Sequence, residues 1–424
     1  MSRFRVLHLG IVFALCLAAS DALAEPGQWA RWLQGRLAEL PDSRAIQARV
    51  EADLARSRAL SQPLYNPSVI VDYENSAENT GTVGINQTLD WSGKGRAAEA
   101  VGEVAAELAR VTAERDRARL TTAAIDALIS WDAAHQRLAV ARQQEQRLQR
   151  LTGLVHRREN SGDLGRIDAT LAYLALARVQ EELAAAESQA VTAETTLRQV
   201  LAVQRPDVSL PAPERWRGVA EPRPRQSLDD NYAVRLAGLR AQLAERGVTL
   251  AARERHTDPT IGVRAGREGD ATLWGLEVAV PLPLFNTGVP EYQAAMADAE
   301  GERAGLERQR RRQQAELEGA LRDYQQRLTR WQQWRDAAAP LADSDALLER
   351  VWRQGEWTTQ EYLQGLDRQL QARLAGVALR EAMQHAWLRW LYQSATLGNW
   401  LSRLAGGNAS FLPATSSHRP EGKP

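Results

Sequence analysis

Few of the side chains that commonly do chemistry occur in this sequence at a spacing that would build a site. Gly93-Lys94 resembles the end of a phosphate-binding loop, but that motif's upstream glycine and following serine or threonine are missing, so a helix start explains the pair better. Five histidines beyond the N-terminus lack metal-ligand spacing, and we interpret them as helix-surface residues: His135, His156, His256, His385 and His418. We therefore predict no catalytic residue, no metal site and no cofactor.

Charge and sulfur content exclude further classes of protein. The chain has 53 basic and 53 acidic residues, and this balance does not favour a nucleic acid as partner. One cysteine and three methionines are too few for a relay of soft metal ions. Carboxylates are abundant, but they lie on predicted helices, where charged faces are usually only solvated. We predict that the protein is not an enzyme.

The N-terminus has the pattern of a secretory signal peptide over residues 1–24. Two arginines precede an apolar run at 9–19, and a small-x-small cleavage site follows at 22–24. An uncleaved anchor is the weaker alternative, because the apolar run is short and polar residues follow it. A lipoprotein signal at Cys16 is a second alternative, although the preceding Leu15 is larger than a lipidation site prefers.

After the signal the chain repeats itself. Asn66-Pro67 and Asp258-Pro259 each open an alternating segment, which leads into a long helical pattern, a glycine-centred break and a second helix. The breaks contain Gly162 and Gly355, and an acidic residue lies six positions after each glycine. We predict a first repeat over 25–204, a proline-rich linker over 205–227, a second repeat over 228–402 and a disordered tail over 403–424.

The helical patterns are far longer than those of an ordinary globular domain. No proline interrupts residues 97–156, and a helix of about 60 residues is roughly 90 Å long. Apolar residues recur at coiled-coil spacing at Val101, Val104, Leu108 and Val111, and again at Leu317, Leu321, Tyr324, Leu328 and Trp331. Alanine flanks both sides of these seams, which favours a wall of helices over the alternative, a rod-like coiled coil.

The segments between the helices alternate with period two, as strands with one apolar face do. The predicted apolar faces are Val69, Val71 and Tyr73; Val83, Ile85, Leu89 and Trp91; Ile261, Val263 and Ala265; and Trp274, Leu276, Val278 and Val280. Ile70 and Gln87 break the pattern. Each segment has about ten residues, enough for a tilted strand to cross a bilayer. A soluble sandwich would explain the alternation equally well; the export signal, the long helices and aromatic residues near the strand ends favour the membrane.

Four strands cannot close a barrel, and an open sheet edge cannot face lipid. We therefore expect several subunits to contribute two hairpins each. The polar faces would line a wet lumen with Asp72, Glu74, Asp90, Arg264 and Glu277. The predicted fold class is mainly α with a β-barrel part: a long α-helical coiled-coil barrel plus a transmembrane β-barrel completed by trimerisation, with four strands per chain.

Up to about Leu404 the chain resembles the TolC-like outer-membrane efflux proteins. The resemblance rests on an ordered set in duplicate: the Asn-Pro and Asp-Pro strand openings, the glycine-acid breaks, and the segments Gln-Thr-Leu-Asp-Trp-Ser-Gly-Lys (87–94) and Pro-Leu-Pro-Leu-Phe-Asn (281–286). Residues 281–286 and the Asp-Pro opening look most like the CzcC-type channels of heavy-metal efflux systems.

The resemblance implies a homotrimer with a twelve-stranded barrel and a twelve-helix periplasmic tunnel. It implies outer-membrane lipid, a periplasmic adaptor protein and an inner-membrane efflux pump as partners. The protein would lie in the outer membrane of a Gram-negative bacterium, with a large periplasmic part. There it would passively conduct substrates, heavy-metal cations among them, from the adaptor and the pump to the exterior.

In the TolC-like family, which this chain resembles, the two helix–helix turns form periplasmic tips that gate the entrance and contact the adaptor. By that match the tip residues are Gly162, Asp163, Asp168, Gly355, Glu356 and Glu361. The sequence leaves two roles open for Asp168 and Glu361: carboxylates around a cation-attracting mouth, or caps of their helices. For the whole chain, the alternative is a periplasmic coiled-coil adaptor of an export system without its own barrel; adaptors carry one helical hairpin, whereas this sequence predicts two.

Overall fold

The computed structural model describes residues 26–75, 79–161, 165–211, 228–340 and 344–406. The predicted signal peptide with Cys16 lies outside these residues, as do the tip residues Gly162 and Asp163 and most of the predicted linker. Within the described part of the chain, no helix has the length and hydropathy that a membrane span requires.

Both halves of the chain contain a helix, two strands, a long helix and a second helix in this order, and each half adds short helices to it. The first half contains α1 (Pro26–Glu39), α2 (Pro41–Ala59), β1 (Ser68–Glu74), β2 (Thr80–Thr88), α3 (Lys94–Asn160) and α4 (Arg166–Leu201). The second contains α6 (Tyr232–Glu254), β3 (Thr260–Glu268), β4 (Ala271–Ala279), α7 (Val289–Ala338), α8 (Ser344–Arg353), α9 (Thr359–Gln393) and α10 (Leu397–Leu404). Since α10 continues to Leu404, the tail boundary predicted at 403 falls within a helix.

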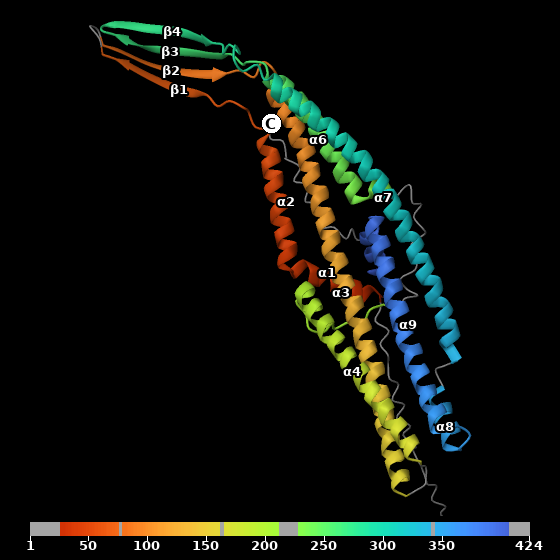
Figure 1. Cartoon of the computed structure of the whole chain (residues 1–424). Helices are drawn as coiled ribbons and strands as arrows, with labels where there is room; N and C mark the ends of the chain where they lie inside the picture. The colour runs from red at the N-terminus through yellow and green to blue at the C-terminus, as the bar shows by residue number, and fades with distance from the viewer. Residues whose placement is uncertain (1–25, 76–78, 162–164, 212–227, 341–343, 407–424) are drawn as a thin grey trace, which may run out of the picture.

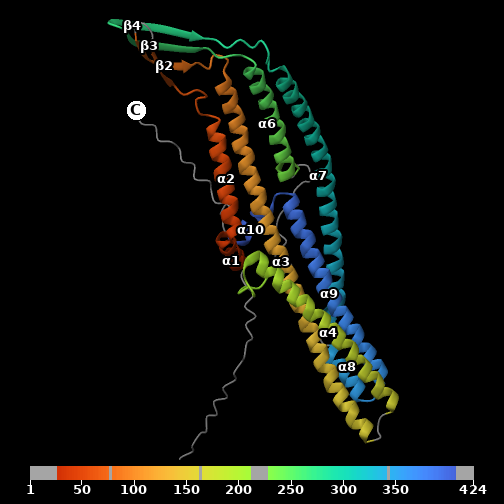
Figure 2. The same cartoon turned by 60° about the vertical axis from the view of Figure 1, so that its left-hand side comes forward.

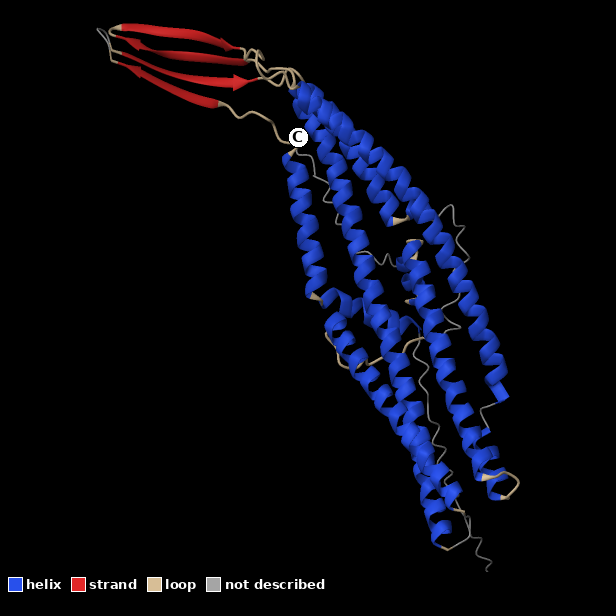
Figure 3. Cartoon of the chain, in the orientation of Figure 1, coloured by secondary structure: helices blue, strands red, loops and turns tan. Residues whose placement is uncertain are grey.

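The molecule is elongated, with the sheet at one end and helices over the rest of its length (Figures 1 and 3). Most of the helices form four columns side by side: the first is α2 and α4, the second α3, the third α6 and α9, and the fourth α7 (Figure 1). Helix α3 packs against α2 and α4 on one side and against α6 and α9 on the other, and α7 packs against α6 and α9. Both views show α6 above α9 between the long helices α3 and α7 (Figures 1 and 2). The predicted wall of helices is therefore confirmed.

The two long helices differ between the halves. Helix α3 has 67 residues without interruption, about 100 Å, and its buried positions are mostly alanine and leucine. Small side chains let neighbouring helices approach on two faces, which suits a wall. In the second half α7 ends at Ala338 and α8 begins at Ser344, so the single long helix expected up to the break at Gly355 is divided.

The four strands form one antiparallel sheet in the order β1-β2-β3-β4. The strands have seven, nine, nine and nine residues, slightly fewer than expected. Val69 pairs with Ile85, Ile85 with Val263 and Val263 with Leu276, so one apolar row crosses all four strands. Strands β1 and β4 each have one neighbour among the described residues, which leaves both edges of the sheet unpaired.

The largest core lies midway along the wall, where α1 and α10 pack on the columns. Trp29 of α1 and Trp400 of α10 meet edge to face with their ring centroids 6.2 Å apart. Leu317, Tyr324 and Trp331 of the predicted seam lie in this cluster. A second cluster joins the end of α3, the start of α4, α8 and α9 at the far end of the wall. The wall is thus held at its middle and at its tip.

Candidate functional site

One face of the sheet is apolar and open to the surroundings. The exposed fraction is 71% for Val71, 81% for Trp274 and 73% for Leu276. Their neighbours on this face are exposed too: Val69, Tyr73, Val83, Ile85, Ile261, Val263 and Val278. A contiguous apolar surface of this size is typical of a surface that contacts lipid or another protein.

The opposite face carries most of the predicted lumenal residues. The strand register puts Asp72, Glu74, Arg264 and Glu277 on this face together. Glycines lie opposite two of them: Gly275 pairs with Arg264, and Gly262 pairs with Glu277. Across this face the sheet therefore combines charged groups with positions that have no side chain.

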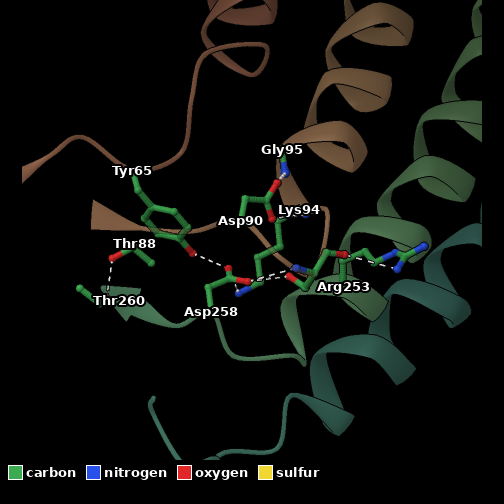
Figure 4. Close-up of polar contacts among 9 residues, drawn as sticks. Tyr65, Thr88, Asp90, Lys94, Gly95, Arg253, Asp258 and Thr260 are labelled. Atoms are coloured by element: carbon green, nitrogen blue, oxygen red, sulfur yellow. Dashed lines mark hydrogen bonds and ion pairs between the residues drawn. The ribbon is translucent and has the colours of Figure 1, made fainter. Parts of the chain in front are cut away.

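Asp90 is placed differently from its prediction. It lies beyond the end of β2, and its carboxylate accepts hydrogen bonds from the backbone amides of Lys94 at 2.7 Å and Gly95 at 2.8 Å (Figure 4). The assignment of Asp90 to the polar face of a strand was wrong, because the alternation continues past the last paired residue. Asp90 satisfies free amides at the start of α3, which is the helix start expected at Gly93-Lys94.

The junction between the sheet and the wall contains a buried carboxylate, Asp258. Its side chain is only 1% exposed, and the Lys94 ammonium lies 2.8 Å from its Oδ2. The Tyr65 hydroxyl donates to Oδ2 at 2.8 Å, and the Ser92 hydroxyl and amide donate to Oδ1 at 3.0 and 3.3 Å (Figure 4). Asp258 therefore joins the start of β3 to both connections of the first repeat. We call Tyr65, Ser92, Lys94 and Asp258 the junction cluster.

The protonation of the junction cluster follows from these contacts. Burial favours the neutral carboxyl of Asp258, but the bonds from Lys94, Tyr65 and Ser92 outweigh it and lower the pKa to about 2. Burial acts against the Lys94 ammonium too, yet its contact with Asp258 raises the pKa above the usual value. Both groups are charged at neutral pH, so the pair is a buried ion pair.

The amino-acid composition contains a signal for the junction cluster, although no motif or spacing marked it. Lys94 and Lys423 are the only lysines among 53 basic residues. Arginine is therefore the default cation, and the junction is the one described place where lysine replaces it. A compact ammonium fits a narrow buried site that a planar guanidinium would crowd. Asp258 itself was recognised only as half of an Asp-Pro strand opening.

At the opposite end of the wall, the second break begins with Gly355 in a left-handed conformation, at φ 79°. Thr358 then caps α9: Glu361 donates its amide to Oγ1 of Thr358 at 3.2 Å, and its carboxylate accepts from the Thr358 amide at 2.8 Å. The bonds that this carboxylate accepts from the amide and the hydroxyl of Thr358 lower the pKa of Glu361. Glu356, another predicted tip residue, is exposed beside Gly355.

The two predicted tip acids occupy equivalent positions. Asp168 is the third residue of α4, and Glu361 is the third residue of α9. Both lie in the first helical turn, where a negative charge opposes the helix dipole favourably. The cap role is thus present for Glu361 and is favoured by position for Asp168; whether the acids also form a mouth stays a prediction.

His385 differs from its interpretation as a surface residue. It lies on α9 and contacts α3, with Nδ1 2.7 Å from the Asp126 carboxylate of α3 and Nε2 3.9 Å from that of Glu381 in its own helix. Burial opposes the charged imidazole, but these two carboxylates raise its pKa to about 9. Glu381 also pairs with Arg137, so His385 belongs to an ionic cluster that joins the second and third columns.

A comparison with protein families shows what the first half of the chain is similar to. Residues 32–203 match the model of the outer membrane efflux protein family. The match confirms the resemblance to outer-membrane efflux proteins and the predicted outer-membrane location. Outer membrane efflux proteins are channels, so the prediction that this chain is not an enzyme is confirmed too. A comparison with curated proteins found no match.

Solved structures extend the likeness to nearly the whole chain. CusC, described in connection with transmembrane channel formation, has 13% identity and a TM-score of 0.73 over 86% of this chain and 91% of its own. The CmeC outer membrane channel of Campylobacter jejuni has 11% identity and a TM-score of 0.73 over 88% of each chain. The outer membrane protein VceC of Vibrio cholerae has 16% identity and a TM-score of 0.70 over 87% of this chain and 98% of its own. At these identities the likeness concerns the fold, and it confirms the predicted fold class.

Proposed function

We propose that three copies of this chain form a passive outer-membrane channel, with the sheets closing a twelve-stranded barrel and the walls closing a periplasmic tunnel. The observation that carries the proposal is the sheet. It has an exposed apolar face, a polar opposite face and two unpaired edges, which is the form of a segment cut from a lipid-facing barrel. The wall supports it, because in the described part of the chain α2 and α7, at its two margins, pack on inner columns and not on each other, so one copy of the wall is open.

Closure of the barrel by three copies of the sheet predicts the oligomeric state of the protein. The mature protein purified in detergent is expected to have three times the mass of one chain, since strand β4 of each copy would pair with β1 of the next. Light scattering with the detergent contribution subtracted measures this mass. A stable species with the mass of a single chain would contradict closure.

We also propose that the far end of the wall is the periplasmic tip, which contacts an adaptor protein and receives substrate from an inner-membrane pump. This end carries two helix–helix turns per chain, as the family resemblance requires. The adaptor alternative finds less support, because the chain has two helical hairpins, a four-stranded sheet and the fold of solved channels. The tip residues proposed are Asp168, Gly355, Glu356 and Glu361, together with Gly162 and Asp163.

Removing the two tip acids tests whether they surround a cation-attracting entrance to the channel. The variant Asp168→Ala/Glu361→Ala is expected to conduct cations less selectively in a planar bilayer, and block by di- and trivalent cations should weaken several-fold. The reason is that three copies of each carboxylate around one axis attract cations into a narrow entrance. The matched control is Glu181→Ala/Glu307→Ala, which removes two exposed acids from the bodies of α4 and α7. If selectivity and block equal the parent's and only thermal stability falls, the acids serve as caps alone.

For the cargo we propose heavy-metal cations. The proposal rests on the CzcC-like segment 281–286 and on the polar face of the sheet, where Asp72, Glu74 and Glu277 accompany one arginine, Arg264. A deletion strain is expected to tolerate several-fold less of a divalent metal salt and to regain tolerance with the gene on a plasmid. Growth inhibition by a panel of metals and drugs measures this. Unchanged metal tolerance with lowered drug tolerance would assign the channel to a drug pump.

A further inference from the structure

A cavity of about 510 Å³ lies where the third column of the wall is interrupted. The start of α6 forms its upper border and the end of α9 its lower border, while α3 and α7 pass on the two sides (Figures 1 and 2). The gap exists because two short helices stand end to end between two long ones. We call it the arginine cavity, after the five arginines that line it: Arg115, Arg119, Arg240, Arg308 and Arg312.

The borders of the arginine cavity are held by defined bonds. Asn231 is buried, and its side-chain oxygen accepts from the amides of Ala233 and Val234 at the start of α6. Its side-chain nitrogen donates to the Gln393 carbonyl at 2.7 Å and to Oε1 of Gln313 at 3.1 Å. One side chain thus ties α6, α7 and α9 together, so the cavity is a fixed feature of the wall.

The charges around the cavity are unbalanced. Five guanidinium groups from α3, α6 and α7 face two lining carboxylates, Glu302 and Glu316. Arg312 pairs with Glu316 at 2.7 Å, and Arg115 pairs with Asp116 at 2.8 Å.

The remaining arginines lack a counter-ion. Within the part of the chain that the structure describes, Arg119 donates to one group, the neutral hydroxyl of Tyr392, at 3.1 Å. Among the described residues, no hydrogen bond or ion pair to Arg240 or Arg308 is formed. Arg119, Arg240 and Arg308, exposed side chains on three different columns, therefore border one hollow, and among the described residues none of them forms an ion pair with the lining carboxylate Glu302.

We propose that the arginine cavity binds a compact multivalent oxyanion of the phosphate class. Guanidinium groups bind phosphate oxygens through paired N–H donors, and an ion between them would relieve their mutual repulsion. Arg119, Arg240 and Arg308 would be the principal ligands, because they have donors to spare. Tyr392 and Gln309, which also line the cavity, add neutral polar groups.

The position of the cavity favours a soluble anion over a lipid headgroup. Arg115 lies 21 residues beyond the start of α3 at Lys94, which is about 30 Å along the helix from the junction with the sheet. A headgroup at the membrane surface would not reach that depth of the wall. Phosphate-bearing metabolites or polyphosphate dissolved in the periplasm would reach the cavity.

The test uses the full-length protein in detergent and sodium tripolyphosphate as the probe, at constant ionic strength. Isothermal titration is expected to show saturable binding to the parent and at least about tenfold weaker binding to Arg240→Gln/Arg308→Gln. The matched control, Arg322→Gln/Arg330→Gln, removes two exposed arginines of α7 that lie outside the cavity and should bind like the parent. Arg240→Lys/Arg308→Lys keeps the charge but loses the paired donors, and an intermediate affinity is expected.

Three outcomes would overturn or refine the proposal. Absence of binding of both tripolyphosphate and phosphatidylglycerol to the parent overturns it. Equal loss in the cavity variant and the control variant also overturns it, because binding would then follow net charge rather than the site. In a parallel arm, micelles containing phosphatidylglycerol replace the soluble anion; binding there alone, with the same dependence on Arg240 and Arg308, would retain the phosphate site and assign it to a lipid headgroup. Circular dichroism of each variant verifies that the helices are intact.

Discussion

Asp258→Asn is expected to lower the free energy of unfolding by about 3–5 kcal/mol, the usual cost of leaving one partner of a buried ion pair alone. The substitution keeps the shape and the acceptor for Ser92, but it removes the negative charge beside Lys94. An ammonium that is 14% exposed cannot recover its hydration in that position. Urea unfolding of the detergent-solubilised protein, followed by circular dichroism, measures the loss.

A second variant separates the ion pair from general damage at the junction. Asp258→Asn/Lys94→Met removes both charges and should recover part of the loss, because a neutral buried pair has no unpaired ion. Tyr65→Phe removes one hydrogen bond and should cost about 1 kcal/mol. If the double variant is no more stable than Asp258→Asn, the ion pair is not what stabilises the junction.

The same cluster predicts a pH dependence. The Asp258 carboxyl has a pKa of about 2 in the folded protein and about 4 in the unfolded chain. Its contribution to stability is therefore fully present at pH values above about 4. That stability is lost as the pH falls from about 4 towards 2. For Lys94, whose pKa is raised, the contribution is present below about 10.4 and is lost as the pH rises beyond it. Asp258→Asn should therefore flatten the acid limb of the stability profile.

Val71→Arg is expected to destabilise the assembled channel by about 2–4 kcal/mol, the cost of an arginine at the lipid-facing midplane of a barrel. Val71 is 71% exposed on the apolar face and lies in the middle of β1. Heat-induced dissociation of the trimer in lipid vesicles, followed on unheated gels, provides the measurement. Fewer folded trimers should also appear in the outer membrane.

The neighbouring residue supplies a matched control. Ile70 is equally apolar, but it points to the opposite face, where Gly84 pairs with it and leaves room. Ile70→Arg introduces the same side chain one position away in the same strand, and we expect assembly close to the parent's. Equal damage from both substitutions would show that the two faces of the sheet do not differ in their surroundings.

Periodicity predicted much of this architecture because it depends on local repetition. The seam has an apolar residue every three or four positions, and that spacing alone puts these side chains on one helix face: Leu317, Leu321, Tyr324, Leu328 and Trp331. The apolar faces of the strands follow in the same way from period two. The division of α7 from α8 was missed although a signal for it is present, because Pro340 lies just beyond the end of α7 and a proline there cannot continue the helix.

Contacts between distant segments could not be predicted. Asp258 and Lys94 are far apart in the sequence, and their meeting depends on the pairing of β2 with β3, which brings the two repeats side by side. Asp90 was misplaced for a related reason: alternation continues through it, but only the partner strand determines where pairing ends. The arginine cavity likewise arises from α3, α6, α7 and α9 meeting around one gap.

By itself the sequence determined the class of protein: export, duplication, long helices and four two-faced strands are all encoded in residues close together along the chain. The tertiary structure alone decided which charges are buried together, where the strands stop and where the columns of the wall are broken. The physical reason is the distance along the chain between the residues that produce each feature. Helix and strand periodicity arises between residues a few positions apart, whereas a buried ion pair or a cavity depends on side chains that only the packed columns and paired strands bring within a few ångströms.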